Sequence, residues 1–307
     1  MEVGRILKGV GGFYYVYCDG KVYESKATAL FRKKNIKLAV GDYVEFTRND
    51  DGTLYIKDIK PRKNLFIRPP VSNVEEVLLV VSTKEPKCNY QLIDRMILLS
   101  RYNGINPKII ITKTDLDNAL ADKIKADYER AGFKVIKTST KDPDTIAEIK
   151  NITSEKTIML MGVSGVGKST LISELIGMDL ETGDISQKTL RGKHTTRHVE
   201  LMHYDHDSYI VDTPGFSSLA IDFVKDVYQL EELYREFHND FHCKFRDCLH
   251  INEPGCLVKN KVLNGEIEKF RYDNYLYFNE EIKNRRWQWI YYHHRFWQQI
   301  LQIYQKT

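Results

Sequence analysis

The sequence predicts an α/β protein in three parts: a small β-barrel, a mostly parallel sheet covered by helices, and a mostly helical region that binds a metal. Three observations support this prediction. Short alternating runs separated by glycine turns fill residues 1–68, and apolar strands alternate with helical patterns up to residue 222. Cysteine and histidine residues then cluster at 243–256. The expected boundaries are a barrel at 1–68, a sheet domain at 69–222, a metal-binding domain at 223–284 and a helical tail at 285–307.

The first part of the chain consists of short antiparallel strands by its pattern. Residues 4–25 hold two alternating runs joined by Gly-Gly and Asp-Gly turns, and residues 40–62 repeat the arrangement around a turn that reads NDDG. Several short strands at close spacing favour a closed barrel, for which an OB-fold is a good candidate. An SH3-like barrel fits the same pattern. Pro69 and Pro70 end this part of the chain.

Length and composition indicate globular domains and no membrane span. The chain has 307 residues, of which 42% are hydrophobic and 29% are charged. No apolar run approaches the ~20 residues that cross a bilayer. The first residues alternate and carry charge, which is unlike a signal peptide. We therefore expect a monomer in the cytoplasm that does not associate with membranes.

Charge is distributed unevenly along the chain. Residues 1–68 hold 14 Lys and Arg against 8 Asp and Glu, residues 69–239 hold 21 against 26, and residues 240–307 hold 11 against 8. Basic ends around an acidic middle indicate that the ends contact a polyanion such as RNA. Ordinary solvated lysines give the same counts, so the charges alone leave both interpretations open.

The middle of the chain alternates apolar strands with amphipathic helices. Such alternation predicts a mostly parallel sheet with helices on both faces. Gly104 and Gly132 stand where two of the helices are expected to stop. The expected strands lie at 75–83, 107–112, 134–140, 156–162, 198–204 and 207–213, and the expected helices at 89–104, 116–132, 144–152 and 169–177.

A phosphate-binding loop stands between one of these strands and the next helix. The run GVSGVGKS at 162–169 fits the pattern GxxxxGK[ST] in the strand–loop–helix context that such a loop requires. Glycines let backbone N–H groups turn toward phosphate oxygens, Lys168 reaches the outer phosphates, and the Ser169 hydroxyl ligates Mg²⁺. The expected nucleotide contacts come from Gly162, Val163, Ser164, Gly165, Val166, Gly167, Lys168, Ser169 and Thr170.

A candidate guanine-binding motif, TKTD, follows an earlier strand. Asp115 can accept hydrogen bonds from N1–H and the 2-amino group of guanine at once, and adenine offers no such donor pair. The stem of Lys113 is expected to lie over the base, with Ser139 or Thr138 near guanine O6. Threonine replaces the commoner asparagine at the first position, which loses one amide contact. The expected base-binding residues are Thr112, Lys113, Thr114, Asp115 and Ser139.

Two further motifs are expected to sense the γ-phosphate. Asp212 ends a strand and can hold Mg²⁺ through water, and the N–H of Gly215 in the following Pro-Gly turn can contact the γ-phosphate. Between the phosphate loop and this turn lies RGKHTTRH, whose polar, glycine-containing surroundings are typical of a mobile switch. The hydroxyl of Thr196, or else of Thr195, is expected to complete the Mg²⁺ shell.

These motifs occur in an unusual order. The base-binding motif precedes the phosphate loop, whereas an ordinary GTPase has the loop first. A parallel sheet tolerates such a circular permutation when the original chain ends lie close together. In this order the γ-phosphate sensor leads directly into the C-terminal region, so we expect the nucleotide state to act on that region.

A group of cysteines and one histidine predicts a structural zinc site. Cys243, Cys248, His250 and Cys256 offer three thiolates and one imidazole, which suit tetrahedral Zn²⁺ at about 2.0–2.3 Å. An odd, clustered set of cysteines in a cytoplasmic chain favours a metal over disulfides. His238 and His242 are alternative ligands, which the spacing does not exclude.

The order and the residues of the motifs resemble one family, the circularly permuted ribosome small subunit-dependent GTPases called RsgA or YjeQ. The resemblance covers the barrel, TKTD, GVSGVGKS, RGKHTTRH, DTPGF and the cysteine cluster, and fades beyond about Arg286. It implies an OB-fold RNA-binding domain, a permuted GTPase domain and a zinc domain. It also implies GTP hydrolysis stimulated by the small ribosomal subunit during late maturation, with that subunit, its rRNA, GTP and GDP as partners.

The residue that orients the attacking water is not the usual one. Phe216 follows DTPG where many GTPases carry a glutamine, and phenylalanine cannot orient water. We take His194, beside the switch threonines, as the candidate catalytic residue, because the family's switch carries a histidine at this place. An exposed loop histidine is the alternative interpretation.

Two questions remain open at the level of sequence. Residues 285–304 hold all three tryptophans among arginines at helical spacing, which fits either RNA contact or packing on the chain's own body. For the whole protein, a GTPase acting on a ribosomal particle competes with a GTP-gated RNA-binding module with negligible catalysis. An ATPase is disfavoured by Asp115.

Overall fold

The protein divides by packing into two compact units, which we call the first and second units. The computed structural model describes residues 2–49, 54–139, 142–177, 199–205, 207–213, 218–238 and 242–285, without the side chains of Arg32, Asp205 and Asp212. The first unit comprises Met1–Cys88, Asn103–Lys125 and Phe133–Ser217, and the second comprises Asn89–Tyr102, Ala126–Gly132 and Ser218–Thr307. The domain boundaries expected at residues 68, 222 and 284 stay predictions.

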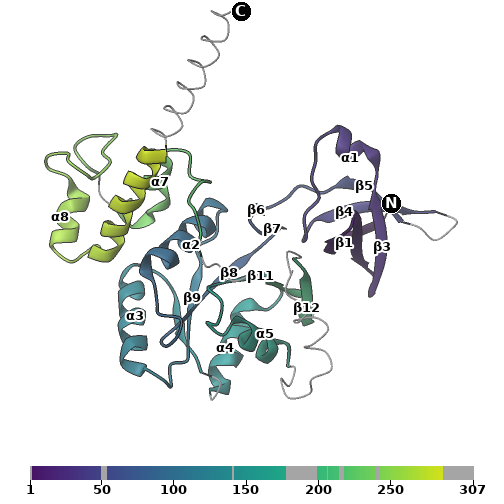
Figure 1. The fold of residues 1–307 in the computed structure, drawn as a ribbon, viewed down its shortest axis with the longest axis horizontal. Coiled ribbons are helices and arrows are strands. Elements are labelled where there is room, and N and C mark those ends of the chain that lie inside the picture. The colour runs from purple at the N-terminus through teal and green to yellow at the C-terminus, as the bar shows by residue number, and fades with distance from the viewer. Residues whose placement is uncertain are drawn as a thin grey trace, which may run out of the picture. The chain divides into compact units, whose positions relative to one another are not determined.

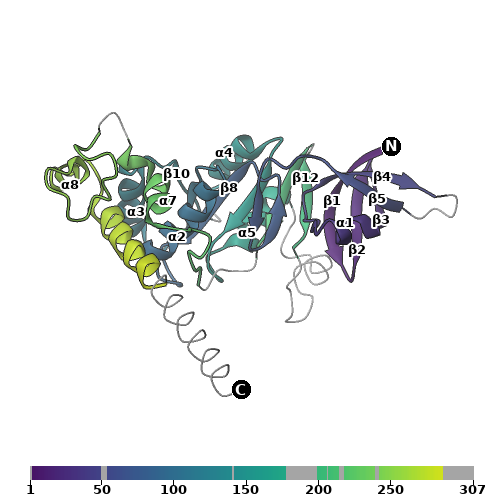
Figure 2. The same ribbon diagram turned by 90° about the horizontal axis from the view of Figure 1, so that it is seen from above.

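The N-terminal part of the first unit is a closed five-stranded barrel (Figure 2). Its strands follow the order β1-β2-β3-β5-β4, with β3 and β5 parallel and every other neighbouring pair antiparallel. This closure of a five-stranded barrel is that of an OB-fold, which confirms the expected architecture over the SH3-like alternative. The elements are β1 (Glu2–Val10), β2 (Phe13–Cys18), β3 (Lys21–Ala27), α1 (Ala29–Lys33), β4 (Tyr43–Arg48) and β5 (Leu54–Ile59).

A short hairpin leads from the barrel to a six-stranded sheet. The sheet has the order β10-β9-β8-β11-β13-β12, and all its neighbouring pairs are parallel except β12 with β13. The mostly parallel sheet is thus confirmed. The hairpin is β6 (Leu65–Ile67) and β7 (Pro70–Ser72), and the sheet strands are β8 (Glu76–Ser82), β9 (Lys108–Thr112), β10 (Val135–Lys137), β11 (Thr157–Met161), β12 (Leu201–Asp205) and β13 (Ser208–Asp212).

Apolar side chains on one face of the sheet form a core with two helices. Every residue of β8 and β11 is buried, as expected of central parallel strands. Figure 1 shows α4 (Pro143–Thr153) and α5 (Lys168–Ile176) beside this sheet. Because alternate strand residues share a face, their common core marks one side of the sheet as covered by both helices. This core includes Leu78, Val80, Ile110, Ile149, Ile158, Leu160, Leu171, Ile172 and Leu175.

The strand order explains how a chain with permuted motifs still forms one continuous, mostly parallel sheet. From the central pair β8 and β11, one half of the chain adds β9 and β10 on one side, and the other half adds β13 and β12 on the other. The loops after β8, β9 and β11 therefore leave the same edge of the sheet. Ligands of open α/β sheets bind at such a switch point, outside the carboxyl ends of the strands.

Within the first unit, the barrel contacts the strands that lead to the phosphate-binding side. The buried Arg5 donates to Thr157 Oγ1 at 2.5 Å, and its guanidinium lies 4.4 Å from the ring centroid of Tyr209. Lys8 pairs with Glu200 at 3.0 Å, where β1 also forms a bridge with the segment before β12. The barrel is thus connected to β11, β12 and β13 by polar contacts.

The second unit is mostly helical. Its helices are α2 (Tyr90–Tyr102), α7 (Val227–Leu233), η1 (Arg235–Phe237) and α8 (Leu257–Leu263), and residues 269–285 are also helical. Residues 126–132, at the end of α3 (Asn118–Arg130), belong to it as well. We expected α2 to belong with the sheet, between whose strands β8 and β9 it lies in sequence. Its packing groups it with the C-terminal residues instead.

A charged cluster is buried inside the second unit. Arg271 is fully buried and lies 2.6 Å from Asp94 of α2 and 2.7 Å from Glu236 of η1. Arg101 adds a second contact to Glu236 at 2.9 Å, and Asn274 donates to Asp94 at 2.6 Å. These contacts join residues that lie up to 180 positions apart in the sequence.

Among the described residues, no helix combines the length and the apolar character needed to cross a membrane.

Candidate nucleotide site and metal centre

The phosphate loop joins the end of β11 to the start of α5. A Cβ atom on Gly162 would lie 2.3 Å from Val80 O, so only glycine fits beside β8 at this point. Gly167 caps α5 with a φ of 101°, in the left-handed region that favours glycine. The sequence thus turns the loop back over the strand end and directs the first N–H groups of α5 toward it, where they can hold phosphate.

Lys168 lies across this loop. Its ammonium donates to the carbonyl oxygens of Gly162 at 2.9 Å and Val163 at 3.0 Å, and the residue is buried. Ser169 is exposed in the first turn of α5. A cation over the loop and a hydroxyl beside it are the groups that a triphosphate and its magnesium ion need.

Thr112, at the end of β9, contacts the phosphate loop directly. Its buried hydroxyl lies 2.5 Å from Val166 O and 3.0 Å from Val81 O, and can donate to either. A Cβ atom on Gly167 would lie 3.6 Å from Thr112 Oγ1. Threonine therefore replaces the missing asparagine amide with a hydroxyl contact between the base-binding motif and the loop.

Lys113 forms a second connection between the two motifs. Its ammonium donates to Gly165 O at 2.8 Å in the phosphate loop and to Glu85 O at 2.6 Å after β8. Its backbone has a φ of 56°, uncommon for a residue with a side chain, and Thr83 donates to its carbonyl at 2.6 Å. The lysine stem therefore extends from the end of β9 toward the phosphate loop.

A pocket of about 240 Å³ unites pieces that are distant in the chain. Asp115 lines it together with Gly167 and Thr170, so the proposed guanine acceptor and the phosphate loop share one cavity. Thr114 donates to Thr138 O at 3.1 Å, which joins the motif to the end of β10. The lining residues are Thr112, Lys113, Asp115, Leu116, Thr138, Ser139, Gly167, Thr170, Leu171 and Glu174.

Three lining residues escaped the sequence analysis: Leu116, Leu171 and Glu174. Leu171 and Glu174 lie on α5 with Thr170, and the spacing of one helical turn between Thr170 and Glu174 could have indicated a shared face. Burial raises the pKa of the Glu174 carboxyl above its ordinary value. Glu174 is thus a second carboxyl group in the pocket wall, besides that of Asp115.

The γ-phosphate sensor is described only in part. The backbone of Asp212 lies beside Leu160, and the buried Thr213 donates to Leu160 O at 2.6 Å, close to the start of the phosphate loop. The Asp212 side chain, Gly215, His194, Thr195 and Thr196 lie outside the described residues and side chains. The roles expected of them stay predictions.

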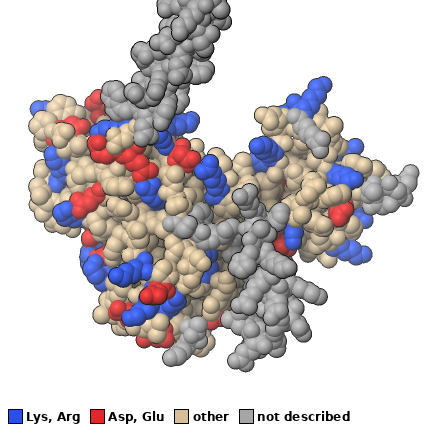
Figure 3. All heavy atoms as spheres, in the orientation of Figure 1, with Lys and Arg blue, Asp and Glu red and all other residues tan. Residues whose placement is uncertain are grey.

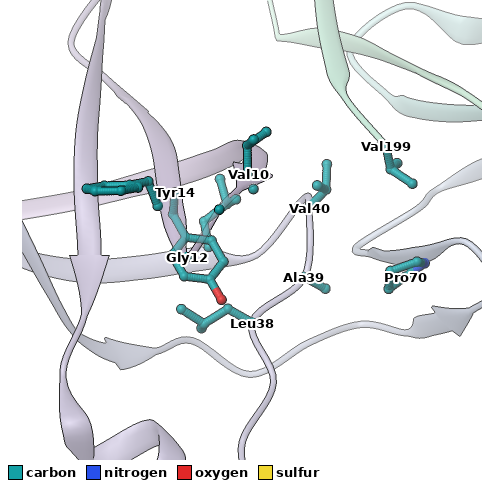
Figure 4. A pocket seen from close by; sticks show the side chains of 12 residues that line it. Val10, Gly12, Tyr14, Leu38, Ala39, Val40, Pro70 and Val199 are labelled. Atoms are coloured by element: carbon teal, nitrogen blue, oxygen red, sulfur yellow. The ribbon is translucent and has the colours of Figure 1, made fainter. Parts of the chain in front are cut away.

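A second hollow, of about 250 Å³, lies at the β1–β2 hairpin of the barrel (Figure 4). Figure 4 shows the side chains of Tyr14, Leu38 and Val40 around it, with Pro70 and Val199. Among the described residues, no carboxylate, amine, imidazole or thiol lines it. The acids and amines that a nucleotide needs are in the pocket of Asp115 instead.

The predicted zinc ligands converge in the second unit. The metal-binding atoms of Cys243, Cys248, His250 and Cys256 all lie within 4.8 Å of one another. His250 Nδ1 lies 3.4 Å from Cys256 Sγ and 3.6 Å from Cys243 Sγ, distances that suit ligands around one tetrahedral ion. Burial raises the pKa of the Cys248 and Cys256 thiols, so thiolates there need the charge of a cation. The donor set and its geometry fit Zn²⁺.

The two alternative histidines do not join this set. His238 Nε2 lies 3.2 Å from a carboxylate oxygen of Glu231, and His242 is exposed. Glu231 itself also contacts His250, at 2.9 Å. Sequence analysis missed this glutamate, because a carboxylate on a separate helix carries no spacing signal.

Comparison with known proteins agrees with this arrangement. The "RsgA N-terminal domain" family matches residues 3–56, and the "RsgA GTPase" family matches residues 59–222, more than half of the chain. The chain belongs to the RsgA GTPase family. The RsgA relatives include proteins named small ribosomal subunit biogenesis GTPase: RsgA 2 of Oceanobacillus iheyensis, 43% identical over 93% of this chain and 99% of its own, and RsgA of Bacillus subtilis, 42% identical over the same shares.

Solved RsgA structures share the fold. The crystal structure of YloQ, described as a circularly permuted GTPase, has a TM-score of 0.74 and 38% identity over 93% of this chain and 96% of its own. YjeQ from Thermotoga maritima has a TM-score of 0.78 and 33% identity over 92% and 98%. The resemblance inferred from the motifs, the circular permutation and the GTPase activity are thus confirmed at the level of the family.

Proposed function

We propose that this GTPase binds the small ribosomal subunit and assists its biogenesis, in line with relatives that are named small ribosomal subunit biogenesis GTPases. The observation that best supports the proposal is the pocket shared by Asp115 and the phosphate loop. Two pieces that are far apart in the chain line one pocket there, as binding of a guanine nucleotide requires. Family membership supplies the ribosomal role.

Asp115, the phosphate loop and the two motifs after it would divide the work of binding and hydrolysis. Asp115 would select guanine by accepting hydrogen bonds from N1–H and the 2-amino group of the base, and the loop N–H groups with Lys168 would hold and neutralise the phosphates. Ser169, Thr196 and Asp212 would hold Mg²⁺, which neutralises charge that develops on the phosphate oxygens. Gly215 would contact the γ-phosphate. Because the catalysis consists of positioning and charge stabilisation, Lys168→Ala should abolish turnover.

The attacking water needs a residue to orient it, and we assign this role to His194. Phe216 stands at the position of the usual glutamine and has no hydrogen-bonding group. Substituting His194 by Ala should leave GTP binding intact and remove the stimulated turnover. Unchanged stimulated turnover in the variant would exclude His194 from the reaction.

We infer that the barrel contacts ribosomal RNA. Phe13 lines the hairpin hollow, and Lys26 Nζ lies 4.9 Å from the centroid of its ring. Aromatic rings beside cations suit stacked, unpaired bases, and OB-folds bind nucleic acid with this part of the barrel. Figure 3 shows Lys and Arg side chains spread over the barrel. The aromatic tail beyond residue 285 is a second candidate for RNA contact.

The four-ligand cluster would hold one structural zinc ion and order the loop between α7 and α8. We infer further that the protein acts as a monomer in the cytoplasm, where ribosomal subunits mature. Metal content measured on the purified protein tests the first inference. Light scattering at several concentrations tests the oligomeric state.

A multiple-turnover GTPase assay with and without small ribosomal subunits tests the proposed function. We expect slow hydrolysis alone, strong stimulation by small subunits, and none with Lys168→Ala. Small subunits should also be retained with a non-hydrolysable GTP analogue more than with GDP. Nucleotide-dependent retention without stimulated hydrolysis would favour a GTP-gated RNA-binding module, which the family's naming as GTPases does not favour.

A further inference from the structure

His250 is held through both nitrogens of its ring. Nδ1 faces the cysteine sulfurs, while Nε2 lies 2.9 Å from the Oε1 atom of Glu231 on α7. The His250 side chain is 6% exposed and that of Glu231 15% exposed, so water has little access to the pair. An ionised carboxylate can only accept a hydrogen bond. The ring proton therefore belongs on Nε2, which leaves the Nδ1 lone pair for a metal.

We propose that Glu231 is a positioning residue of the zinc site, and this inference rests on the zinc site proposed above. Glu231 would fix the tautomer of His250 and aim its Nδ1 at the ion. Carboxylates that accept from the second nitrogen of a ligating histidine act in this way. Glu231 would thus not bind the zinc ion itself, but it would determine how strongly His250 binds the ion.

The other groups that pack around His250 do not bond to its Nε2 atom. Tyr272 donates to the backbone carbonyl of His250 at 2.6 Å, and Tyr275 donates to that of Leu249 at 2.7 Å. The ring of Phe237 packs edge-on against the imidazole with centroids 5.5 Å apart. These groups fix the backbone and the ring plane, but none of them bonds to Nε2. Of the groups bonded to the ring among the described residues, Glu231 alone is a carboxylate.

Glu231 is itself placed by the local sequence. Asp226 caps α7 by accepting from the N–H groups of Tyr228 at 3.1 Å and Gln229 at 2.9 Å. Leu230 is buried, which orients the helix. His238 Nε2 lies 3.2 Å from the same Oε1 atom but is 46% exposed. One carboxylate therefore connects α7 to the loop of the zinc site, 19 residues further along the chain.

Zinc affinity, measured by competition with a chromophoric chelator, tests the proposal. Glu231→Ala should weaken zinc binding about 10–100-fold, the usual cost of losing such a partner. Glu231→Gln keeps an acceptor oxygen without the charge and should lose less. The matched control is Glu232→Gln, because Glu232 is the next residue of α7 and is exposed. The control should bind zinc as the unchanged protein does.

Nitrogen NMR of the imidazole in the zinc-loaded, unsubstituted protein gives an independent readout. We expect a metal-bound Nδ1 and a protonated Nε2 on His250. A merely structural ion pair between α7 and the loop would change stability but not zinc affinity. Equal zinc affinity of Glu231→Ala and the unchanged protein, or metal bound through Nε2, would overturn the proposal.

If Glu231→Ala fails to fold, the zinc affinity of Glu231→Gln and the NMR measurement test the proposal instead. If the unchanged protein binds no zinc, the zinc site itself is wrong and this inference fails with it.

Discussion

The sheet of the first unit and the core of the second unit are held together by different interactions. β8 and β11 are buried at every residue, and most of these residues are aliphatic. In the second unit, the fully buried Arg271 lies between Asp94 and Glu236, beside the ring of Tyr234. Four side chains that could ligate a metal ion converge in the same unit. One region depends on apolar burial and the other also depends on charge.

This difference explains how each region positions its functional groups. In the first unit, parallel strands end at one edge, so the loops that follow them meet without any specific long-range pair. In the second unit, Cys248 and Cys256 lie in an apolar core with Phe237, Val258 and Tyr275, and the predicted zinc ion would fix their loop further. We therefore expect agents that act on metals or charges to affect the two regions unequally.

Zinc removal should separate the two regions most clearly. Structural zinc contributes about 10–16 kcal/mol in small zinc-finger peptides, so its loss should release the loop at 243–256 and weaken the packing of the second unit. Amide exchange in residues 242–285 should accelerate after chelation, while exchange in β8 and β11 measured on the same sample stays unchanged. Equal acceleration in β8 and β11 would show that the regions are not independent.

Asp115→Asn should disable the first unit without unfolding it. The variant loses two hydrogen bonds to a charged acceptor, each worth about 1.5–3 kcal/mol, so GTP affinity should fall about 10²–10⁴-fold. Xanthosine triphosphate should gain affinity, because the asparagine amide can donate to its 2-carbonyl. The control is Asp122→Asn, whose carboxylate is 59% exposed. Retained GTP affinity in Asp115→Asn would remove this residue from base recognition.

Arg271→Met should break the buried cluster of the second unit. Removing one partner from a buried ion pair costs about 3–5 kcal/mol, and here Asp94 and Glu236 would stay buried while each loses a cationic partner. Urea unfolding followed by exchange in residues 269–285 measures the loss. Arg130→Met is the matched control in the same unit, since Arg130 pairs with Glu268 at the surface, and its effect should be within experimental error. Similar losses in both variants would contradict the assigned role of burial.

Thr112→Val tests the connection between the base-binding motif and the phosphate loop, and its effect should be the smallest. The change keeps the shape but removes the donor to Val166 O, which costs about 1–3 kcal/mol for a buried acceptor. GTP affinity measured by calorimetry should fall accordingly. Thr112→Ser retains a hydroxyl and should recover most of the affinity. A Val variant that binds GTP normally would show that the contact does not support the site.

The sequence predicted the first unit better than the second for physical reasons. The phosphate loop needs particular residues at fixed spacing, as Gly162 against Val80 O illustrates, so the motif identified the strand, the loop and the helix together. Strand periodicity indicated the barrel but could not decide between barrel types, because the pairing of β3 with β5 depends on contacts distant in the chain. Periodicity likewise carries no information on strand direction, so it could not predict that β12 is antiparallel to β13.

Long-range charge pairs account for most of what sequence analysis missed. Asp94 and Arg271 look like ordinary surface residues of amphipathic helices, yet both are completely buried. Their contact places α2 with the C-terminal helices, whereas chain order suggested the sheet. Glu231 was missed for the same reason, since nothing near it in sequence indicates His250. By contrast, the four zinc ligands lie close together in sequence, and that proximity made them predictable.

We expect Asp115 and the phosphate loop, which the permuted chain brings together, to form one guanine nucleotide site. Titration calorimetry of the purified protein with GDP and with ADP isolates the contribution of the base, because both ligands carry the same phosphates. GDP should bind tightly with measurable heat, and ADP should give a far weaker signal. Equal affinity for the two nucleotides would rule out base recognition by Asp115.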